Sequence, residues 1–329
     1  MKLIRILTFI TLALYMTSYD YALIPIPGKF PEGKRFTVTE GEPFYRVALR
    51  LKEEGVIRDY RGFVVLGWWL GASRVIKAGE YEFKRERTAY EILDKLIRGD
   101  VVVYRVTIPE GSSLFDIAHL LEKEGLTSSE RFLAKATDPE LLKELGVEGV
   151  SAEGYLFPDT YLLTRGFGEE MIIRMMVARF RRVFTEALAL RAKELKMTEG
   201  EVITLASLIE KEAAVEWERP IISAVFHNRL KRGMKLQSDP SAVYELTGFK
   251  GRISWVHLKR KSEYNTYYVA GLPPGPIANP GRSSMLAALY PAKVNYLYFV
   301  SKNDGTHHFS TSLEEHNRAV ARYQRADGG

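Results

Sequence analysis

The chain contains no cysteine. This absence excludes disulfide frameworks, thiolate nucleophiles and cysteine-ligated metal sites. It leaves the compartment open, because many exported bacterial proteins also lack cysteine. The glycine motifs that bind nucleotides, the H-E-x-x-H zinc motif and the G-x-S-x-G nucleophile motif are missing as well. If the chain is an enzyme, its chemistry therefore depends on carboxylate side chains. The sequence predicts neither a cofactor nor a metal.

The charge balance is mildly basic. The 329 residues are 46% hydrophobic and 27% charged, with a formal net charge of +6. Such a composition is typical of a globular protein of two or three domains. The positive charge suits an anionic polymer or a membrane surface. Because the basic residues are spread along the chain and form no zinc-finger, basic-zipper or RNA-binding motif, we do not expect nucleic acid as a partner.

A long hydrophobic run opens the chain, over residues 6 to 24, after two basic residues. Its length is close to the roughly 20 residues that a membrane helix needs, and tyrosines near its end suit the membrane interface. The region that follows has no good cleavage site for a signal peptide. We therefore predict an uncleaved single-pass anchor in the inner (cytoplasmic) membrane. A cleaved export signal is the alternative, and either would place the rest of the chain on the periplasmic or extracytoplasmic side.

Residues 36–57 and 106–127 form an internal repeat with a constant offset of 70. The identical pairs are Thr37/Thr107, Glu40/Glu110, Gly41/Gly111, Ala48/Ala118, Leu51/Leu121, Glu54/Glu124 and Gly55/Gly125. Each copy predicts a short strand, an E-G turn and an amphipathic helix closed by glycine.

The second copy, "VTIPEGSSLFDIAHLL", resembles the peptidoglycan-binding LysM motif. Any strand–turn–helix unit with a glycine turn is the alternative. We predict an anchor with the start of a stalk over 1–27, a LysM-like domain over 28–105 and a catalytic domain over 106–329. The second LysM-like repeat and a connector occupy 106–165 within that last domain.

The second half of the chain predicts helices followed by loops and a hairpin. Residues 169–195 show helical periodicity, and residues 295–312 read as two strands around an N-D-G turn. A last helix is predicted over 312–326. His307 and His308 are adjacent in a predicted strand, so they face opposite sides and we expect a structural role. Together these elements predict a mixed α+β fold.

Four glutamates crowd the stretch "LASLIEKEAAVEWE". On a helix that starts near Thr198, Glu210 and Glu212 lie at opposite boundaries of the buried stripe. Glu216 falls nearer the stripe and Glu218 points mostly away. A boundary carboxyl group is partly desolvated, which raises its pKa and favours general acid–base work. Helical geometry alone does not choose between these candidates and a charged helix flank.

Longer blocks carry a family resemblance. Residues 206–244 and 264–281, together with "EGYLFPDTYLL" (153–163) and "IKAGEY" (76–81), resemble the membrane-bound endolytic murein transglycosylases, the MltG or YceG-like family. The similarity covers essentially the whole chain.

The resemblance implies a peptidoglycan lyase. Such enzymes cleave the β-1,4 bond between N-acetylmuramic acid and N-acetylglucosamine within glycan strands and leave a 1,6-anhydro-muramic end. The family's catalytic glutamate is the first in the "SLIEKE" block, which is Glu210 here. It acts as acid and then as base, and no second carboxylate is needed because the substrate's own hydroxyl attacks. Peptidoglycan strands are the expected partner, and cell-wall synthases are candidate partners.

Five further residues are candidates for substrate binding. Gln237, Ser238 and Asp239 form a polar turn that suits N-acetyl or hydroxyl groups, with a capping turn as the alternative. Asn265 and Tyr267 are candidates to line the glycan groove, because amide and aromatic side chains suit acetamido groups and sugar faces.

Two rival readings stay open. One is a muramidase that uses water, with Asp239 or Glu212 as partner to the acid. The other is a non-catalytic LysM-type scaffold that binds peptidoglycan and tethers synthases. Glu153 and Asp159 are spare carboxylates without an assigned role.

Overall fold

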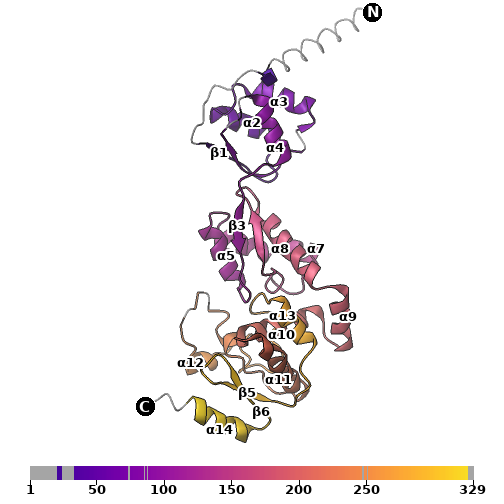
Figure 1. Cartoon of the computed structure of the whole chain (residues 1–329), viewed down its shortest axis with the longest axis vertical. Helices are drawn as coiled ribbons and strands as arrows, with labels where there is room; N and C mark the ends of the chain where they lie inside the picture. Colours follow the sequence, from indigo (N-terminus) through magenta and orange to yellow (C-terminus); the bar gives the residue numbers. More distant parts are fainter. Residues whose placement is uncertain are drawn as a thin grey trace, which may run out of the picture. The chain divides into compact units, whose positions relative to one another are not determined.

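The computed structural model in Figure 1 describes residues 21–23, 33–72, 75–84, 86, 88–246, 248–249 and 251–324. The predicted anchor over 6–24 lies outside the described residues except for Tyr21–Leu23. Within the described part, no helix is both long and apolar enough to cross a bilayer.

The chain folds as two compact units. The first takes the described residues up to Val106, together with Gly125–Thr127 and Leu162–Gly168, and the second takes the remaining described residues. The strands β3 (Tyr104–Thr107) and β4 (Thr160–Leu163), where the division falls, pair as a two-stranded sheet. The domain limits predicted from the sequence stay a prediction.

The first unit is built on an antiparallel strand pair. Its elements are β1 (Lys34–Val38), α2 (Phe44–Glu53), α3 (Tyr60–Trp69), β2 (Gly79–Phe83) and α4 (Ala89–Arg98). In the pairing, Lys34 lies opposite Phe83 and Val38 opposite Gly79. Phe36, Tyr81 and Phe83 are buried between these strands and the helices. The unit therefore has a hydrophobic core of its own.

Both copies of the repeat show the predicted order of strand, turn and helix. Gly41 and Gly111 have the same left-handed backbone, each with φ of 74°. The helices that follow are α2 and α5 (Leu114–Lys123), and each is closed by a glycine with positive φ, Gly55 and Gly125. The order of elements within the repeat is confirmed, whereas its likeness to LysM stays a prediction.

The second unit is mainly helical. Its further elements are α6 (Ser129–Ala136), α7 (Pro139–Glu144), α8 (Glu169–Val183), α9 (Glu186–Glu194), α10 (Glu199–Glu212), η2 (Glu216–Glu218), α11 (Arg219–Lys231), η3 (Asp239–Ala242), α12 (Trp255–Leu258), α13 (Arg282–Leu289), β5 (Tyr298–Ser301), β6 (His307–Ser310) and α14 (Leu313–Tyr323). The antiparallel hairpin of β5 and β6 and the mixed α+β fold are confirmed.

One predicted helix is two. The sequence predicted a continuous helix over 169–195, but α8 ends at Val183 and α9 begins at Glu186. Thr185 takes an extended backbone, with φ of −72° and ψ of 166°, at the N-cap of α9. Periodicity alone does not reveal such a break, because the apolar spacing continues through it.

Helix α10 lies at the centre of the second unit, packed against α13 and α11 (Figure 1). It begins where the sequence predicted, with a capping box between Thr198 and Glu201. Eight consecutive residues, Val202 to Ile209, are buried, so the helix is covered on all sides rather than along one stripe. Because Ala213 is extended, the helix ends before Glu216, which lies in η2 instead.

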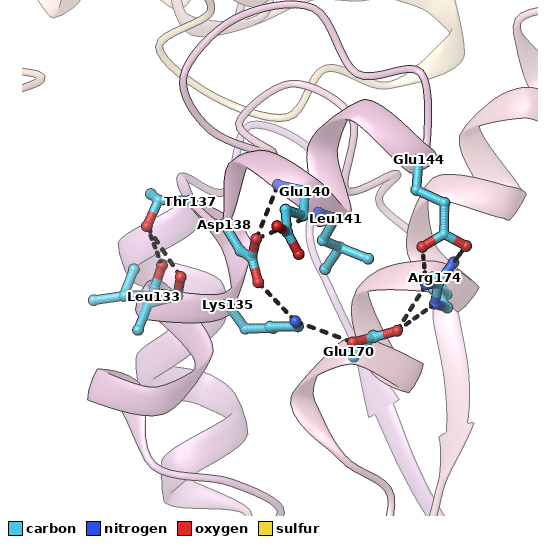
Figure 2. A network of polar contacts seen from close by, with 10 residues as sticks. Leu133, Lys135, Thr137, Asp138, Glu140, Leu141, Glu144, Glu170 and Arg174 are labelled. Atoms are coloured by element: carbon cyan, nitrogen blue, oxygen red, sulfur yellow. Dashed lines mark hydrogen bonds and ion pairs between the residues drawn. The ribbon is translucent and has the colours of Figure 1, made fainter.

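A polar network joins α6, α7 and α8 (Figure 2). Glu170 lies 3.1 Å from Lys135 and 2.7 Å from Arg174. Arg174 also reaches Glu144 at 2.6 Å, and Lys135 reaches Asp138 at 2.7 Å. Single exposed ion pairs contribute little to stability, so the geometry of this network serves mainly to fix α8 against the two preceding helices.

Candidate active site

Glu210 lies in the last turn of α10, and its side chain is 5% exposed. Both carboxylate oxygens accept hydrogen bonds. Arg219 Nη2 donates to Oε1 at 3.0 Å, and the backbone N–H of Gly281 donates to Oε2 at 2.9 Å. Gly281 is the N-cap of α13, where the helix dipole also favours a negative charge. The structure thus holds a nearly buried carboxyl group between a guanidinium and a helix N-terminus.

Arg219 is itself held in place. It is the first residue of α11, and its Nε donates to Ser284 Oγ in α13 at 3.0 Å. Only 13% of its side chain is exposed. A planar guanidinium can bond two partners in fixed directions, so Arg219 ties α11 and α13 to the carboxylate of Glu210.

The E-G turn of the second repeat rests against the end of α10. The backbone N–H of Gly111 donates to the carbonyl of Asn279 at 2.9 Å, and Lys211 Nζ donates to the carbonyl of Gly111 at 3.2 Å. A Cβ atom on Gly111 would lie 3.4 Å from Cγ of Glu210. The turn therefore lies close to the side chain of Glu210.

A second carboxylate accompanies Glu210. Oε1 of Glu110 lies only 2.0 Å from where a Cβ on Gly281 would be. Burial raises the pKa of Glu110, the charge of Glu210 raises it further, and Arg219 opposes both effects. Two carboxyl groups thus lie against Gly281.

Glu212, the other boundary glutamate of the predicted helix, is the last residue of α10. Ser238 Oγ donates to its Oε1 at 2.5 Å. Burial raises the pKa of Glu212 to about 7, while the bond from Ser238 opposes the shift. Glu212 therefore anchors the turn that holds Ser238.

The predicted polar turn, Gln237–Asp239, is bonded to the second predicted segment through Tyr267. Gln237 has a left-handed backbone with φ of 53°, and its Oε1 accepts from Arg229 Nη1 at 3.1 Å. The hydroxyl of Tyr267 donates to Asp239 Oδ1 at 2.5 Å. A left-handed conformation is unusual for a residue other than glycine and is often found at functional sites. The structure thus brings Gln237, Asp239 and Tyr267 into one cluster.

Two of the predicted binding residues are wholly buried. Ser238 sits at the N-cap of η3 but makes no capping bond, because its hydroxyl goes to Glu212. Asn265 donates to the carbonyls of Leu258 and Arg260 at 3.0 and 2.6 Å. Its Oδ1 accepts from the N–H of Tyr267 at 3.0 Å. Burial favours a positioning role for both, and direct contact with substrate stays a prediction.

The spare carboxylates have structural partners. Glu153 is 2% exposed and accepts from the N–H of Leu114 at 2.8 Å, from Tyr244 at 3.0 Å and from Asn279 Nδ2 at 2.7 Å. Burial raises its pKa to about 7. Asp159, in contrast, forms an ion pair with an arginine of α8, and hydrogen bonding keeps its pKa below the usual range.

The remaining glutamates of "LASLIEKEAAVEWE", Glu216 and Glu218, also have partners in the fold. Glu216 accepts a bond from Ser283 at 2.9 Å. Glu218 was predicted to point away from the core, and this is wrong, because its side chain is 0% exposed. It accepts from the backbone N–H of His307 at 2.9 Å and lies 2.7 Å from Nδ1 of the same residue. The structural role predicted for His307 fits this pairing.

A cavity of about 290 Å³ lies beside Lys211, the neighbour of Glu210 in the chain. Its lining includes Phe115, Asp116, Tyr244 and Phe249, so aromatic faces and polar groups both reach it. Sites of this mixed character bind small organic groups.

Comparison with known proteins decides the family. The model of the YceG-like family matches residues 36–322. The chain belongs to the YceG-like family. An endolytic murein transglycosylase of Bacillus subtilis strain 168 is 34% identical over 302 residues, which cover 87% of this chain and 83% of that protein.

Further relatives agree. The endolytic murein transglycosylase of Streptococcus pneumoniae serotype 2 (strain D39) is 30% identical over 93% of this chain, which spans 62% of that protein's length. The crystal structure of a yceG-like protein of Listeria monocytogenes has a TM-score of 0.61 and 32% identity. It covers 87% of this chain and 98% of its own.

In this YceG-like chain, sequence reasoning missed Glu110, Arg219 and Gly281. The repeat did mark Glu110 through its match to Glu40, but that match was interpreted as turn chemistry alone. Nothing in the local sequence indicates that the residues 100 and 171 positions after Glu110, Glu210 and Gly281, share its surroundings, so only the fold reveals that these residues lie together.

Proposed function

We propose that this YceG-like chain is an endolytic peptidoglycan lytic transglycosylase. It cleaves the β-1,4 bond between N-acetylmuramic acid and N-acetylglucosamine within nascent glycan strands and terminates their elongation with 1,6-anhydro-muramic ends. The names of its relatives support the activity. The observation that carries the assignment of the acid is the nearly buried Glu210 with both oxygens held by donors.

Glu210 performs both proton transfers. As an acid it gives its proton to the glycosidic oxygen while the bond from that oxygen to C1 of the muramic acid breaks. The C6 hydroxyl of the same sugar then attacks C1, and its proton passes to the carboxylate of Glu210. The 1,6-anhydro ring closes, the second strand leaves with a free hydroxyl, and Glu210 is protonated again.

The surroundings of Glu210 suit the middle of this cycle. Once the proton has left, the carboxylate carries a charge beside an oxocarbenium-like sugar. Arg219 and the N–H of Gly281 already point at its two oxygens, so no reorganisation is needed. A fixed carboxylate is also well placed to accept the proton of the C6 hydroxyl in the second step.

The polar cluster and the cavity supply the binding surface in this proposal. Gln237, Asp239 and Tyr267 present amide, carboxylate and aromatic groups, which suit acetamido and hydroxyl groups of the glycan. The cavity beside Lys211, at about 290 Å³, offers aromatic faces for one sugar or acetamido substituent. Ser238 and Asn265 hold this surface in place.

The proposal extends to the N-terminal part. Residues 6–24 anchor the chain in the inner membrane, the LysM-like repeats hold glycan, and catalysis takes place outside the cytoplasm. The apolar run supports the anchor. The shared order of strand, turn and helix in the two copies supports the repeats. Cell-wall synthases are proposed partners.

Product analysis of digested peptidoglycan tests the function. The full-length wild-type chain in detergent is expected to release anhydro-muramic products detectable by mass spectrometry. Glu210→Gln should lower the rate by at least about 10²-fold, the size typical of losing a general acid. Glu201→Gln, on the same helix but in its first turn, is the matched control and should keep the rate.

Two outcomes would contradict the proposal. Reducing muramic ends without anhydro product would show a muramidase that uses water. Binding of glycan by the wild-type chain without any cleavage would show the scaffold. Unchanged cleavage by Glu210→Gln would leave the activity standing and remove Glu210 from it.

A further inference from the structure

We propose that the end of helix α3 contacts the bilayer surface, so that Trp68, Trp69 and Leu70 enter the layer of lipid headgroups beside the anchor. These three residues are called the α3 patch below. The inference rests on the anchor that the proposed function assigns to residues 6–24, and it does not depend on the assignment of Glu210.

The α3 patch consists of large hydrophobic side chains that are open to solvent. Trp68 is 72% exposed, Trp69 44% and Leu70 47%. Single exposed hydrophobic residues are common, but three in succession at the end of one helix indicate a contact surface. Tryptophan is enriched where membrane meets water, because its ring is apolar while its N–H bonds water or headgroups.

The end of the apolar run packs on the same helix (Figure 1). The hydroxyl of Tyr21 donates to the carbonyl of Asp59, the N-cap of α3, at 2.5 Å. A Cβ on Gly62 would lie 2.9 Å from the ring of Tyr21, so glycine leaves room for that ring. Ala22 is 7% exposed and belongs to the hydrophobic core of the first unit. The last residues of the run are therefore part of this unit.

The chain leaves little distance between the bilayer and the first unit. Asp20 is the first charged residue after Arg5, and charged side chains avoid hydrocarbon. The hydrocarbon of an anchored chain therefore ends at or before Asp20. Ala22 follows two positions later, and two residues span at most about 7 Å. This reach is close to the thickness of one headgroup layer, about 5–8 Å, so the first unit begins at the membrane surface.

The helix directs the two tryptophans away from the core. The residues of α3 that face the core are Phe63, Leu66 and Gly67. At about 100° per residue, Trp68 and Trp69 both lie more than about 100° from the middle of that side. Trp69 is seven residues after Gly62, so it shares the face against which Tyr21 packs, about 10 Å further along the axis. When α3 lies along the bilayer, the patch therefore reaches the headgroups.

The chemistry of the patch favours lipid over glycan. Sites for polar ligands place a few hydrogen-bonding groups beside their aromatic faces. The sequence from residue 62 to residue 72 contains no acid, amide or hydroxyl side chain. A surface of tryptophan and leucine without such groups suits the boundary of headgroups and acyl chains instead. Contact with glycan or with a second copy of the chain is a separate outcome of the test.

The four tryptophans of the chain allow a direct test. The full-length chain is reconstituted into vesicles of phosphatidylcholine and phosphatidylglycerol, with and without lipids brominated near the top of the acyl chain. In Trp217→Phe/Trp255→Phe only the tryptophans of the patch fluoresce, and bromine should quench about half of the signal or more, because interfacial rings lie at this depth.

Trp68→Phe/Trp69→Phe is the matched control. It leaves Trp217 and Trp255 of the second unit, which are 60% and 69% exposed, and brominated lipid should leave most of their fluorescence. Because all four side chains are exposed, a change to phenylalanine should preserve folding, which circular dichroism checks. Equal quenching in both variants would show contact without preference for α3 and would overturn the inference.

Three further results would also overturn it. Patch fluorescence that bromine leaves unchanged shows that α3 does not reach lipid. A signal that responds to soluble glycan fragments and not to bromine identifies a glycan surface. A signal that changes when the chain is diluted with lipid, but not with bromine, identifies contact between copies.

Vesicle flotation in alkaline carbonate separates this inference from the proposed function. A chain that fails to float lacks the anchor, and the inference then fails with it. A chain that floats and releases anhydro-muramic products, but whose patch is not quenched, keeps the proposed function and loses the lipid contact of α3 alone.

Discussion

Arg219 donates Nη2 to Glu210 at 3.0 Å and Nε to Ser284 at 3.0 Å. One guanidinium therefore connects the end of α10 to α13. Both elements contribute directly to the environment of the same carboxylate, since Gly281 caps α13. A displacement of either helix would change the direction of the donors at Glu210.

Replacing Arg219 should slow the reaction more than it weakens substrate binding. In Arg219→Ala the carboxylate formed after proton donation loses a charged donor, which corresponds to about 1.5–3 kcal/mol and a decrease in kcat of roughly 10–100-fold. The kcat of Arg219→Lys should lie between those of the wild-type chain and Arg219→Ala, because an ammonium keeps the charge but lacks the planar fork that bonds both partners. Steady-state kinetics on purified glycan strands would measure kcat and KM for both variants.

Arg174 provides the matched control. It also pairs with two carboxylates, Glu144 and Glu170, but does so in the network of α7 and α8 (Figure 2). Arg174→Ala should keep kcat. A wild-type kcat in Arg219→Ala would show that the pair with Glu210 is irrelevant to turnover.

The pair of Tyr267 and Asp239 distinguishes two roles for the polar turn. If Asp239 acts mainly by holding the turn, Tyr267→Phe and Asp239→Asn should each raise KM a few-fold. The double variant should then show a coupling of about 1 kcal/mol between them. If Asp239 stabilises the sugar cation directly, Asp239→Asn should instead lower kcat far more than Tyr267→Phe. A double-mutant cycle in kcat/KM and kcat separates the two.

Local signals predicted the elements well where the cause is local. The start of α10 at Thr198 follows from a capping box, and the hairpin of β5 and β6 follows from the N-D-G turn between alternating strands. The strand–turn–helix order of the repeat also follows from its glycines. These elements depend on residues within a few positions of each other.

The site depends on partners far along the chain. Helical angles left Glu210 and Glu212 equivalent, and only their partners distinguish them: Arg219 and Gly281 for one, Ser238 for the other. The prediction for Glu218 was wrong for the same reason, because its partner His307 lies in β6, 89 residues further along the chain. Periodicity describes one helix and carries no information about what packs on its other faces.

The buried pair of Glu218 and His307 should matter for stability rather than for catalysis. Glu218→Ala leaves the backbone N–H and Nδ1 of His307 without their acceptor in a buried place, which should lower the free energy of unfolding by about 2–4 kcal/mol. Urea unfolding followed by circular dichroism measures this. The exposed pair of Glu314 and Arg318 is the control, and Glu314→Ala should change stability by less than about 0.5 kcal/mol. Equal effects of both substitutions would contradict the assignment.

Glu153 should make stability depend on pH in a specific direction. Burial raises its pKa to about 7 in the folded chain, whereas a glutamate in the unfolded chain has a pKa of about 4.3. When the pH lies between these two pKa values, Glu153 carries a proton in the folded chain that it has released in the unfolded chain. The contribution of Glu153 is therefore fully present below about pH 4.3 and is lost as the pH rises through about 7. The loss is at most about 4 kcal/mol, because one pKa unit corresponds to about 1.4 kcal/mol.

Urea unfolding of Glu153→Gln at pH 5, 6, 7 and 8 checks this direction. The fall in stability between pH 5 and 8 should be smaller in the variant than in the wild-type chain, because the substituted amide does not titrate. It should not vanish, since burial raises the pKa of Glu212 to about 7 as well. The double variant Glu153→Gln, Glu212→Gln should reduce the slope further. The exposed Glu194 offers a Glu→Gln control, and an identical slope in the Glu153→Gln variant and the wild-type chain would show that Glu153 does not titrate in this range.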